Sequence, residues 1–339
     1  MEADLANASN VTLDTHARTP LDLPSLRVKR ANAPRLSRVG RLQRMQIGYI
    51  SRGSSTILQS QVAGVRRTPL QTPAIVMDYE TPDGSQFSLR EVYADDAKGR
   101  PLFQYTSITA FVDGKPYAGK SEQRVEDVDD ADILGLLRPV PAENIHPPFS
   151  AGFTQARSTD HAAHYLKAPS FMYEDSEPGR TFVADCLLNE VTVLERLRKH
   201  PHPNIVSYHG CVVKDDRITQ LCLQRYKCNL EDYVTQGLSR QRREDLFEDV
   251  ISAVKHLHSL GLAHNDICPQ NVCIDSDGRP AIVDFDSCIP FGEKLLKGVA
   301  ADRGGGELLS DRENDFDGLD DLKDFLDGFD HEEFAEEGP

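Results

Sequence analysis

Three side chains that can supply oxygen ligands lie close together in the second half of the sequence: Asp266, Asn271 and Asp284. Two short apolar runs, 272–275 and 281–285, flank a turn-forming stretch between them, and this pattern predicts a β-hairpin. The hairpin would place Asn271 at its entrance and Asp284 at its exit, so that all three side chains reach one edge of a cleft. Carboxylate and amide oxygens are suitable Mg²⁺ ligands, and a further carboxylate can orient an attacking hydroxyl. Phosphoryl transfer requires these groups, because its transition state is stabilised by positioning and by cations.

A second pair of charged residues is expected from a helix predicted over residues 182–200. Its apolar stripe repeats at helical spacing and consists of Leu187, Val191, Leu194 and Leu197. Glu190 falls on the same face, where a carboxylate is costly to bury unless it is paired. Lys167, on a short strand predicted over 164–168, is the expected partner.

The remaining elements deliver the chain to this cleft. A hairpin is predicted from the stretches 208–213 and 218–226, and an amphipathic helix from 242–260. That helix leads to His264, which opens the stretch that contains Asp266. The order is therefore a small strand-rich part, a connection, a long helix, and then the loop and hairpin with the oxygen ligands.

The wording of this loop resembles that of a known family. Residues 264–271 read H-N-D-I-C-P-Q-N and are followed by D-F-D at 284–286, which resembles the protein-kinase signature H-R-D-L-x-x-x-N followed by D-F-G. The stretch H-P-N-I-V at 202–206 resembles the junction between the corresponding helix and strand of protein kinases. Together with the stretch 287–295, the wording resembles a divergent family of kinase-like proteins from filamentous fungi.

The resemblance implies that the cofactors are ATP and Mg²⁺. Asp266 would be the catalytic base, with Asn271 beside it in the catalytic loop, and Asn271 and Asp284 would hold the metal. Lys167 and Glu190 would form the pair that positions the phosphates of the nucleotide.

Two further regions receive roles from the resemblance. The hinge at 223–226 would receive the adenine, with Gln224 and Tyr226 as the binding residues. Asp315 would lie on a helix after the active site and would brace the catalytic loop, in a structural rather than a catalytic role.

The sequence also departs from the kinase pattern. Asn265 replaces the Arg of the signature, Asp286 replaces its final Gly, and Cys268 stands where many Ser/Thr kinases carry a Lys. No glycine-rich loop precedes Lys167, and the closest candidate, the stretch 152–154, has one glycine. A segment like A-P-E is missing after Asp286, so these departures weigh more against peptide phosphorylation than against nucleotide binding.

The predicted fold class is α+β, a two-lobed protein-kinase-like fold with a truncated C-lobe. A disordered basic segment over 1–44 and a β-rich accessory region over 45–120 would precede it. An acidic and proline-rich linker over 121–148 would lead to the kinase-like domain at 149–330, followed by an acidic tail at 331–339.

Composition and charge limit where in the cell the protein is expected and which classes of partner it is expected to bind. The formal net charge is −16, and no apolar run is long enough to span a membrane. The start of the chain does not read as a secretory signal, and the seven cysteines show no disulfide or zinc spacing, so we expect a reduced intracellular protein, cytoplasmic or nuclear. The basic stretch 18–44 has no interleaved aromatic residues, and therefore no nucleic-acid partner is expected.

Three functions remain open from the sequence. The first is an ATP- and Mg²⁺-dependent phosphotransferase that acts on Ser or Thr of a protein substrate. The second is a small-molecule kinase that resembles aminoglycoside and choline phosphotransferases, in which the metal motif often reads D-F-D. The third is a pseudokinase scaffold that binds protein partners.

Overall fold

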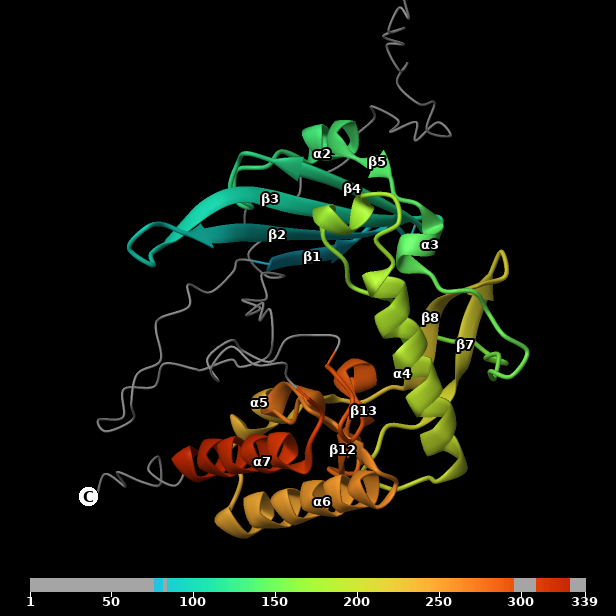
Figure 1. Ribbon diagram of the computed structural model, residues 1–339. Coiled ribbons are helices and arrows are strands. Elements are labelled where there is room, and N and C mark those ends of the chain that lie inside the picture. Colours follow the sequence, from blue (N-terminus) through green and yellow to red (C-terminus); the bar gives the residue numbers. More distant parts are fainter. Residues whose placement is uncertain (1–75, 82–83, 296–308, 330–339) are drawn as a thin grey trace, which may run out of the picture. The chain divides into compact units, whose positions relative to one another are not determined.

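The computed structural model describes residues 76–81, 84–295 and 309–329 of the chain (Figure 1). All described residues belong to one compact unit. The expected disordered segment 1–44, the first part of the β-rich region and the acidic tail 331–339 lie outside the described residues.

The first part of the described chain is a five-stranded antiparallel sheet with the order β1-β2-β3-β4-β5. Its strands are β1 (Val76–Glu80), β2 (Gln86–Asp95), β3 (Pro101–Val112), β4 (Lys115–Ser121) and β5 (Arg138–Pro139). Asp113 and Gly114 connect β3 to β4 with φ values of 53° and 72°, as a two-residue type I′ turn requires. The predicted β-rich region is therefore confirmed over residues 76–121.

The segment 121–148, which was expected to be a linker, is folded into this sheet. It contains α2 (Asp130–Leu136), β5 and α3 (Ala142–Ile145). Four of its apolar residues are buried against one face of the sheet: Val125, Val128, Ile133 and Leu137. Its acidic and proline-rich composition hid these residues, because the four together do not follow one continuous helical or strand period.

A smaller sheet with the order β6-β8-β7 carries the first of the predicted site residues. Its strands are β6 (His164–Lys167), β7 (Tyr208–Lys214) and β8 (Arg217–Gln224), and the helix packed against it is α4 (Phe182–Lys199). The apolar stripe predicted for this helix is buried in the main core together with residues of β7 and β8. The predicted strand, helix and hairpin are thus all present.

The last part of the chain is mainly helical. Its helices are α5 (Leu230–Val234), α6 (Arg240–Ser259) and α7 (Arg312–Asp327); its short strands are β9 (Cys228–Asn229), β10 (Leu262–Ala263), β11 (Val272–Ile274), β12 (Pro280–Ile282) and β13 (Ile289–Pro290). The described residues also contain the short 3₁₀ turns η1 (Tyr173–Ser176), before α4, and η2 (Pro269–Asn271) and η3 (Phe285–Ser287), in this last part. The expected α+β class is confirmed. No helix in the described residues combines the length and the apolar character needed to cross a membrane.

Helix α7 packs beside α6 through an apolar stripe (Figure 1). Leu319, Leu322 and Leu326 of this stripe are buried, whereas Phe316 is 45% exposed. Gly318 of the same helix lies against the backbone of Ile267, in the loop that carries Asp266. A Cβ atom added at Gly318 would lie 2.7 Å from the carbonyl oxygen of Ile267, so the glycine permits a close approach that a side chain would prevent.

Candidate active site

Lys167 connects three elements at the centre of the site. Its Nζ atom lies 2.6 Å from Glu190 Oε1 on α4 and 2.6 Å from Asp284 Oδ1, directly before η3. Glu190 also accepts a hydrogen bond of 3.3 Å from the backbone N–H of Phe285. The sequence led us to expect the contact between Lys167 and Glu190, and the structure adds Asp284 to the same cluster.

Asp284 reaches Lys167 from an unusual backbone conformation. Its φ and ψ angles are 64° and 74°, in the left-handed region that non-glycine residues adopt infrequently. Strand β12 ends at Ile282, and this conformation turns the chain away from the sheet and into η3. The hairpin end thus aims the Asp284 carboxylate at the Lys167 ammonium.

The charges in this cluster do not balance. Burial lowers the pKa of Lys167, but the carboxylates of Asp284, Glu190 and Asp286 outweigh this effect and raise its pKa well above the ordinary value. Burial raises the pKa of Glu190 to about 7; Lys167 opposes this shift, and Asp284 and Asp286 add to it. One lysine therefore stands among three carboxylates, and a divalent cation would relieve the excess negative charge.

Asp266 and Asn271 form the second half of the site. Asn271 Nδ2 donates hydrogen bonds to the backbone oxygen of Asp266 at 2.9 Å and to its Oδ2 atom at 3.0 Å. The backbone N–H of Val283 donates to the carbonyl oxygen of Asn271 at 2.9 Å. Because Val283 directly precedes Asp284, this bond holds the Asp266–Asn271 pair beside the strand end that carries Asp284.

Asp315 braces the loop that begins at His264 and carries Asp266, as the family resemblance implied. Its side chain is fully buried and accepts hydrogen bonds from the backbone N–H groups of His264 at 3.0 Å and Asn265 at 2.7 Å. His258 Nε2 on α6 lies 2.8 Å from the same carboxylate. One side chain from α7 therefore joins the loop to the long helix that precedes it.

The role of Asn265 could not be foreseen from the sequence. Its φ angle is 63°, a conformation that Asn tolerates better than most residues. Its Nδ2 atom lies within 3.1 Å of three acceptors, the carbonyl oxygens of Ala263 and Ser287 and the hydroxyl of Ser310. Asn265, which replaces the arginine of the signature, thus links this loop to Ser287 and Ser310. In the sequence, the tolerance of Asn for positive φ was the one indication of a structural role at this position.

Gln224 and Tyr226 lie where the small sheet joins the helical part. Gln224 ends β8 opposite His164 of β6, and its N–H donates to the carbonyl oxygen of Ser207 at 2.9 Å. Tyr226 packs against the main core, and burial raises the pKa of its hydroxyl to about 12. Gln224 therefore ends the strand that pairs with the one carrying Lys167, and Tyr226 follows that strand, which is the place that a hinge would occupy.

The stretch 152–154, the closest candidate for the missing glycine-rich loop, lies at the opposite edge of the small sheet. Thr154 accepts a hydrogen bond of 2.7 Å from the N–H of Cys211 on β7, and its own N–H donates to Glu195 on α4 at 2.5 Å. Since β6 forms the other edge of the sheet, this stretch does not lie over Lys167. Gly210, with a φ of 128°, allows the close approach, because a Cβ atom there would lie 2.6 Å from the backbone nitrogen of Ala156.

The donor set fits Mg²⁺ better than a metal held by protein groups alone. Among the described residues, no group of three or more His, Cys, Asp or Glu side chains is placed to hold a metal ion. Asn271 and Asp284 offer one amide and one carboxylate, and Mg²⁺ commonly takes one or two protein ligands with phosphate oxygens and water completing its shell. Burial raises the pKa of Cys268 to about 12, so its neutral thiol cannot replace the lysine cation expected at that position.

Comparison with known proteins agrees with this geometry. Residues 172–300 match the family model described as the protein kinase domain, a range that holds Glu190, Asp266, Asn271 and Asp284 and begins just after Lys167. The chain has distant kinase relatives, and it spans from 8% to 33% of the length of the curated relatives compared with it.

Three of these relatives are named as sensors or serine/threonine kinases. The sensor for unfolded proteins in the ER ire1 of Schizosaccharomyces pombe is 34% identical over 122 residues, covering 32% of this chain and 11% of that protein. The serine/threonine-protein kinase ppk6 of the same organism is 31% identical over 101 residues, with 29% and 13% covered. The CBL-interacting serine/threonine-protein kinase 21 of Arabidopsis thaliana is 33% identical over 106 residues, with 28% and 23% covered.

Proposed function

We propose that this protein binds MgATP and transfers its γ-phosphoryl group to a Ser or Thr hydroxyl of a protein substrate. It would do so as a divergent kinase related to the kinase-like proteins of filamentous fungi. The observation that carries the proposal is the contact of Lys167 with both Glu190 and Asp284. A cluster with excess negative charge around the buried Glu190 is costly to fold, and bound cation and nucleotide would offset that cost.

Each residue of the site receives a role in this reaction. Lys167, oriented by Glu190, contacts the phosphates, and Asp266 accepts the proton of the attacking hydroxyl. Asn271 and Asp284 hold Mg²⁺, which when bound neutralises the charge that develops on the phosphate oxygens. Asn271 Nδ2 donates to Asp266, so the side-chain oxygen of Asn271, its Oδ1 atom, is the one that can face the cation. Gln224 and Tyr226 contribute to the adenine site.

The choice of a protein Ser/Thr substrate rests on the relatives, several of which are named as serine/threonine kinases. A small-molecule kinase uses the same phosphate chemistry, so the distinction needs a substrate test. A peptide array and a panel of amino alcohols with [γ-³²P]ATP would separate the two enzymes. Transfer of the labelled phosphate to peptides supports the proposal. Transfer to amino alcohols alone would contradict it and would indicate a small-molecule kinase.

A pseudokinase scaffold is the second candidate, and one observation favours it. The stretch 152–154 lies at the far edge of the small sheet rather than over the site. Nucleotide binding separates this candidate from the enzymes.

The first experiment is therefore a thermal-melt titration with MgATP. A ligand that binds only the folded state at about 100 times its Kd stabilises it by about 2.7 kcal/mol. The parent should shift and Asp284→Ala should not, while Asp277→Ala, which removes an exposed carboxylate from the β11–β12 turn, should shift like the parent. Equal shifts in all three would exclude Asp284 as a ligand for the metal, and no shift in the parent would leave the scaffold as the better reading.

A further inference from the structure

The five-stranded sheet is attached to the first turn of α4, the helix that carries Glu190. We propose that Asn144, on α3, is a positioning residue through which the sheet fixes α4 and thereby holds the Glu190 carboxylate beside Lys167. The consequence for nucleotide binding rests on the proposed function; the attachment itself does not.

Asn144 donates hydrogen bonds to the segment that directly precedes α4. Its side chain is fully buried, and its Nδ2 atom donates to the carbonyl oxygens of Asp175 and Glu177, each at 2.7 Å. These two acceptors lie at the end of η1 and directly after it, on the path to the helix start at Phe182. An amide has two N–H donors, so both are used to hold this one turn.

Apolar packing reinforces the same attachment. A small cluster of buried residues joins the sheet, α3 and the start of α4: Ala118, Val140, Ile145, Phe171 and Val183. Val183 belongs to the first turn of α4, and the backbone N–H of Tyr173 donates to Ser107 Oγ on β3 at 2.9 Å. Figure 1 shows α3 beside the end of α4 that is nearest to the sheet.

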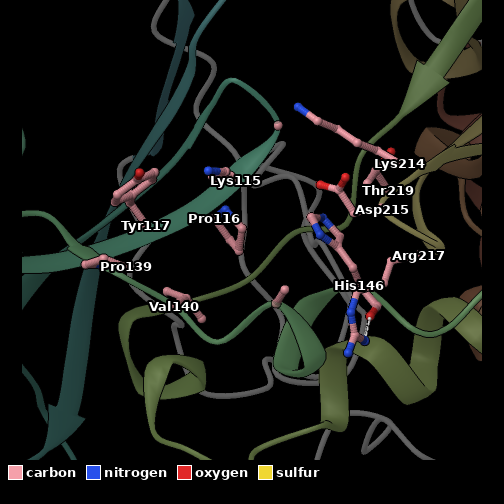
Figure 2. Close-up of a pocket in the computed structure, with 12 residues that line it drawn as sticks. Lys115, Pro116, Tyr117, Pro139, Val140, His146, Lys214, Asp215, Arg217 and Thr219 are labelled. Carbon is pink, nitrogen blue, oxygen red and sulfur yellow. Dashed lines mark hydrogen bonds between the residues drawn. The ribbon is translucent and has the colours of Figure 1, made fainter. Parts of the chain in front are cut away.

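A second attachment joins the same region to the turn between β7 and β8 (Figure 2). Arg217 Nη1 donates to the carbonyl oxygen of His146 at 2.8 Å, and Lys214 Nζ donates to the carbonyl oxygen of Asp113. The backbone N–H of Phe149 donates to the carbonyl oxygen of Asp216 at 2.9 Å. Between these contacts lies a cavity of about 210 Å³ lined by the β3–β4 turn, α3 and the β7–β8 turn.

The two attachments hold both partners of the Lys167–Glu190 pair. Strand β8 pairs with β6, which carries Lys167, while α4 carries Glu190. Glu190 lies about two helical turns, roughly 12 Å, from the start of α4, so a rigid helix transmits any shift of its first turn to the carboxylate. Displacements of about 1 Å in a catalytic group can cost about 100-fold in rate. The sheet therefore acts on the site from a distance.

The decisive variant is Asn144→Asp, which keeps the shape of the side chain but loses the donors and places an acceptor against two carbonyl oxygens. The matched control is Ile133→Ala, because Ile133 is buried on the opposite face of the same sheet and touches neither attachment. Val183→Ala, a smaller change at the apolar contact, serves as the second variant where Asn144→Asp folds poorly. For each protein, affinity is measured for MgATP and, separately, for adenosine, which lacks the phosphates that Lys167 would contact.

If Asn144 positions α4, then Asn144→Asp and Val183→Ala weaken MgATP binding by about 10-fold or more while adenosine affinity stays within about 2-fold. Ile133→Ala lowers the melting temperature and leaves both affinities unchanged. An equal loss for MgATP and adenosine, or no loss for either, overturns the inference.

Hydrogen–deuterium exchange over residues 182–190 tests the attachment without nucleotide. Faster exchange in Asn144→Asp than in Ile133→Ala supports it, and equal exchange overturns it. A parent protein that binds neither ligand refutes the proposed function, and in that case the exchange result alone decides the inference.

Discussion

The carboxylate of Asp315 accepts a hydrogen bond of 2.7 Å from the backbone N–H of Asn265, at the point where the loop that carries Asp266 has a positive φ angle of 63°. Replacing Asp315 with Ala leaves two buried backbone N–H groups, those of Asn265 and His264, without this acceptor. Unsatisfied buried groups cost about 1–3 kcal/mol each, so we expect Asp315→Ala to lower the free energy of unfolding by about 3–5 kcal/mol. Urea denaturation measures this loss; Asp320→Ala, at an exposed position on the same helix, should change it by less than about 0.5 kcal/mol.

Asn265 combines a backbone and a side-chain contribution, and two substitutions separate them. Asn265→Gly keeps the positive φ without strain but loses the side-chain hydrogen bonds, whereas Asn265→Ala loses these bonds and adds about 1–2 kcal/mol of backbone strain. Denaturant unfolding should therefore rank the parent above the Gly variant and the Gly variant above the Ala variant. An Ala variant as stable as the Gly variant would show that the conformation carries no strain.

The raised pKa of Glu190 has a consequence for stability against pH. With a pKa of about 7 in the folded chain and 4.5 as the ordinary value, the folded state keeps a proton that the unfolded state releases. Stability from this group therefore falls as pH rises from about 4.5 to about 7. The charged groups that face it are Lys167, Asp284 and Asp286.

Melting temperatures of the parent and of Glu190→Gln, recorded from about pH 5 to about pH 8, test this. The parent should lose more stability than the variant as pH rises, and a surface control, Glu244→Gln, should follow the parent. Parallel curves for the parent and Glu190→Gln would contradict the assignment.

His146 gives the opposite dependence. Burial and the nearby charge of Arg217 lower its pKa to about 4, from an ordinary value of 6.5. The unfolded chain therefore binds a proton that the folded chain excludes, and stability from this group is lost as pH falls from about 6.5 to about 4. In His146→Phe, a ring that can still stack on Phe111, acid unfolding should begin at lower pH than in the parent. The pH midpoint of unfolding, followed by circular dichroism, measures this shift.

Two glycines in helices should respond in opposite directions to the same substitution. Gly318→Ala would place Cβ 2.7 Å from the carbonyl oxygen of Ile267, and overpacking of this kind costs about 1–3 kcal/mol. Gly135→Ala on α2 meets no atom within 4 Å and should stabilise the protein by about 0.5–1 kcal/mol. Chemical unfolding of both variants measures the difference, and a stabilised Gly318→Ala would show that α7 moves easily away from the loop.

The sequence predicted a contact correctly where a local pattern left few possible partners for a charged residue. Glu190 on an apolar helix face needed a cation, and Lys167 was close enough along the chain to provide it. The stretch 121–148 was misjudged, because Val125 and Ile133 are buried only through contacts with strands earlier in the chain. The partners of Asn265 come from positions far along the chain, such as Ser310, and no local pattern announces them.

The packing of Val183 against Ala118 and Ile145 also limits how the molecule can be divided. A fragment that began at residue 149, or one trimmed to the matched range 172–300, would lack both of these partners. Val183 and Phe171, or Val183 alone in the shorter fragment, would then face water, and exposed apolar patches promote self-association. The five-stranded sheet therefore covers apolar residues of the part of the chain that carries the site. We expect a fragment that contains the site to stay soluble only if it begins before β1.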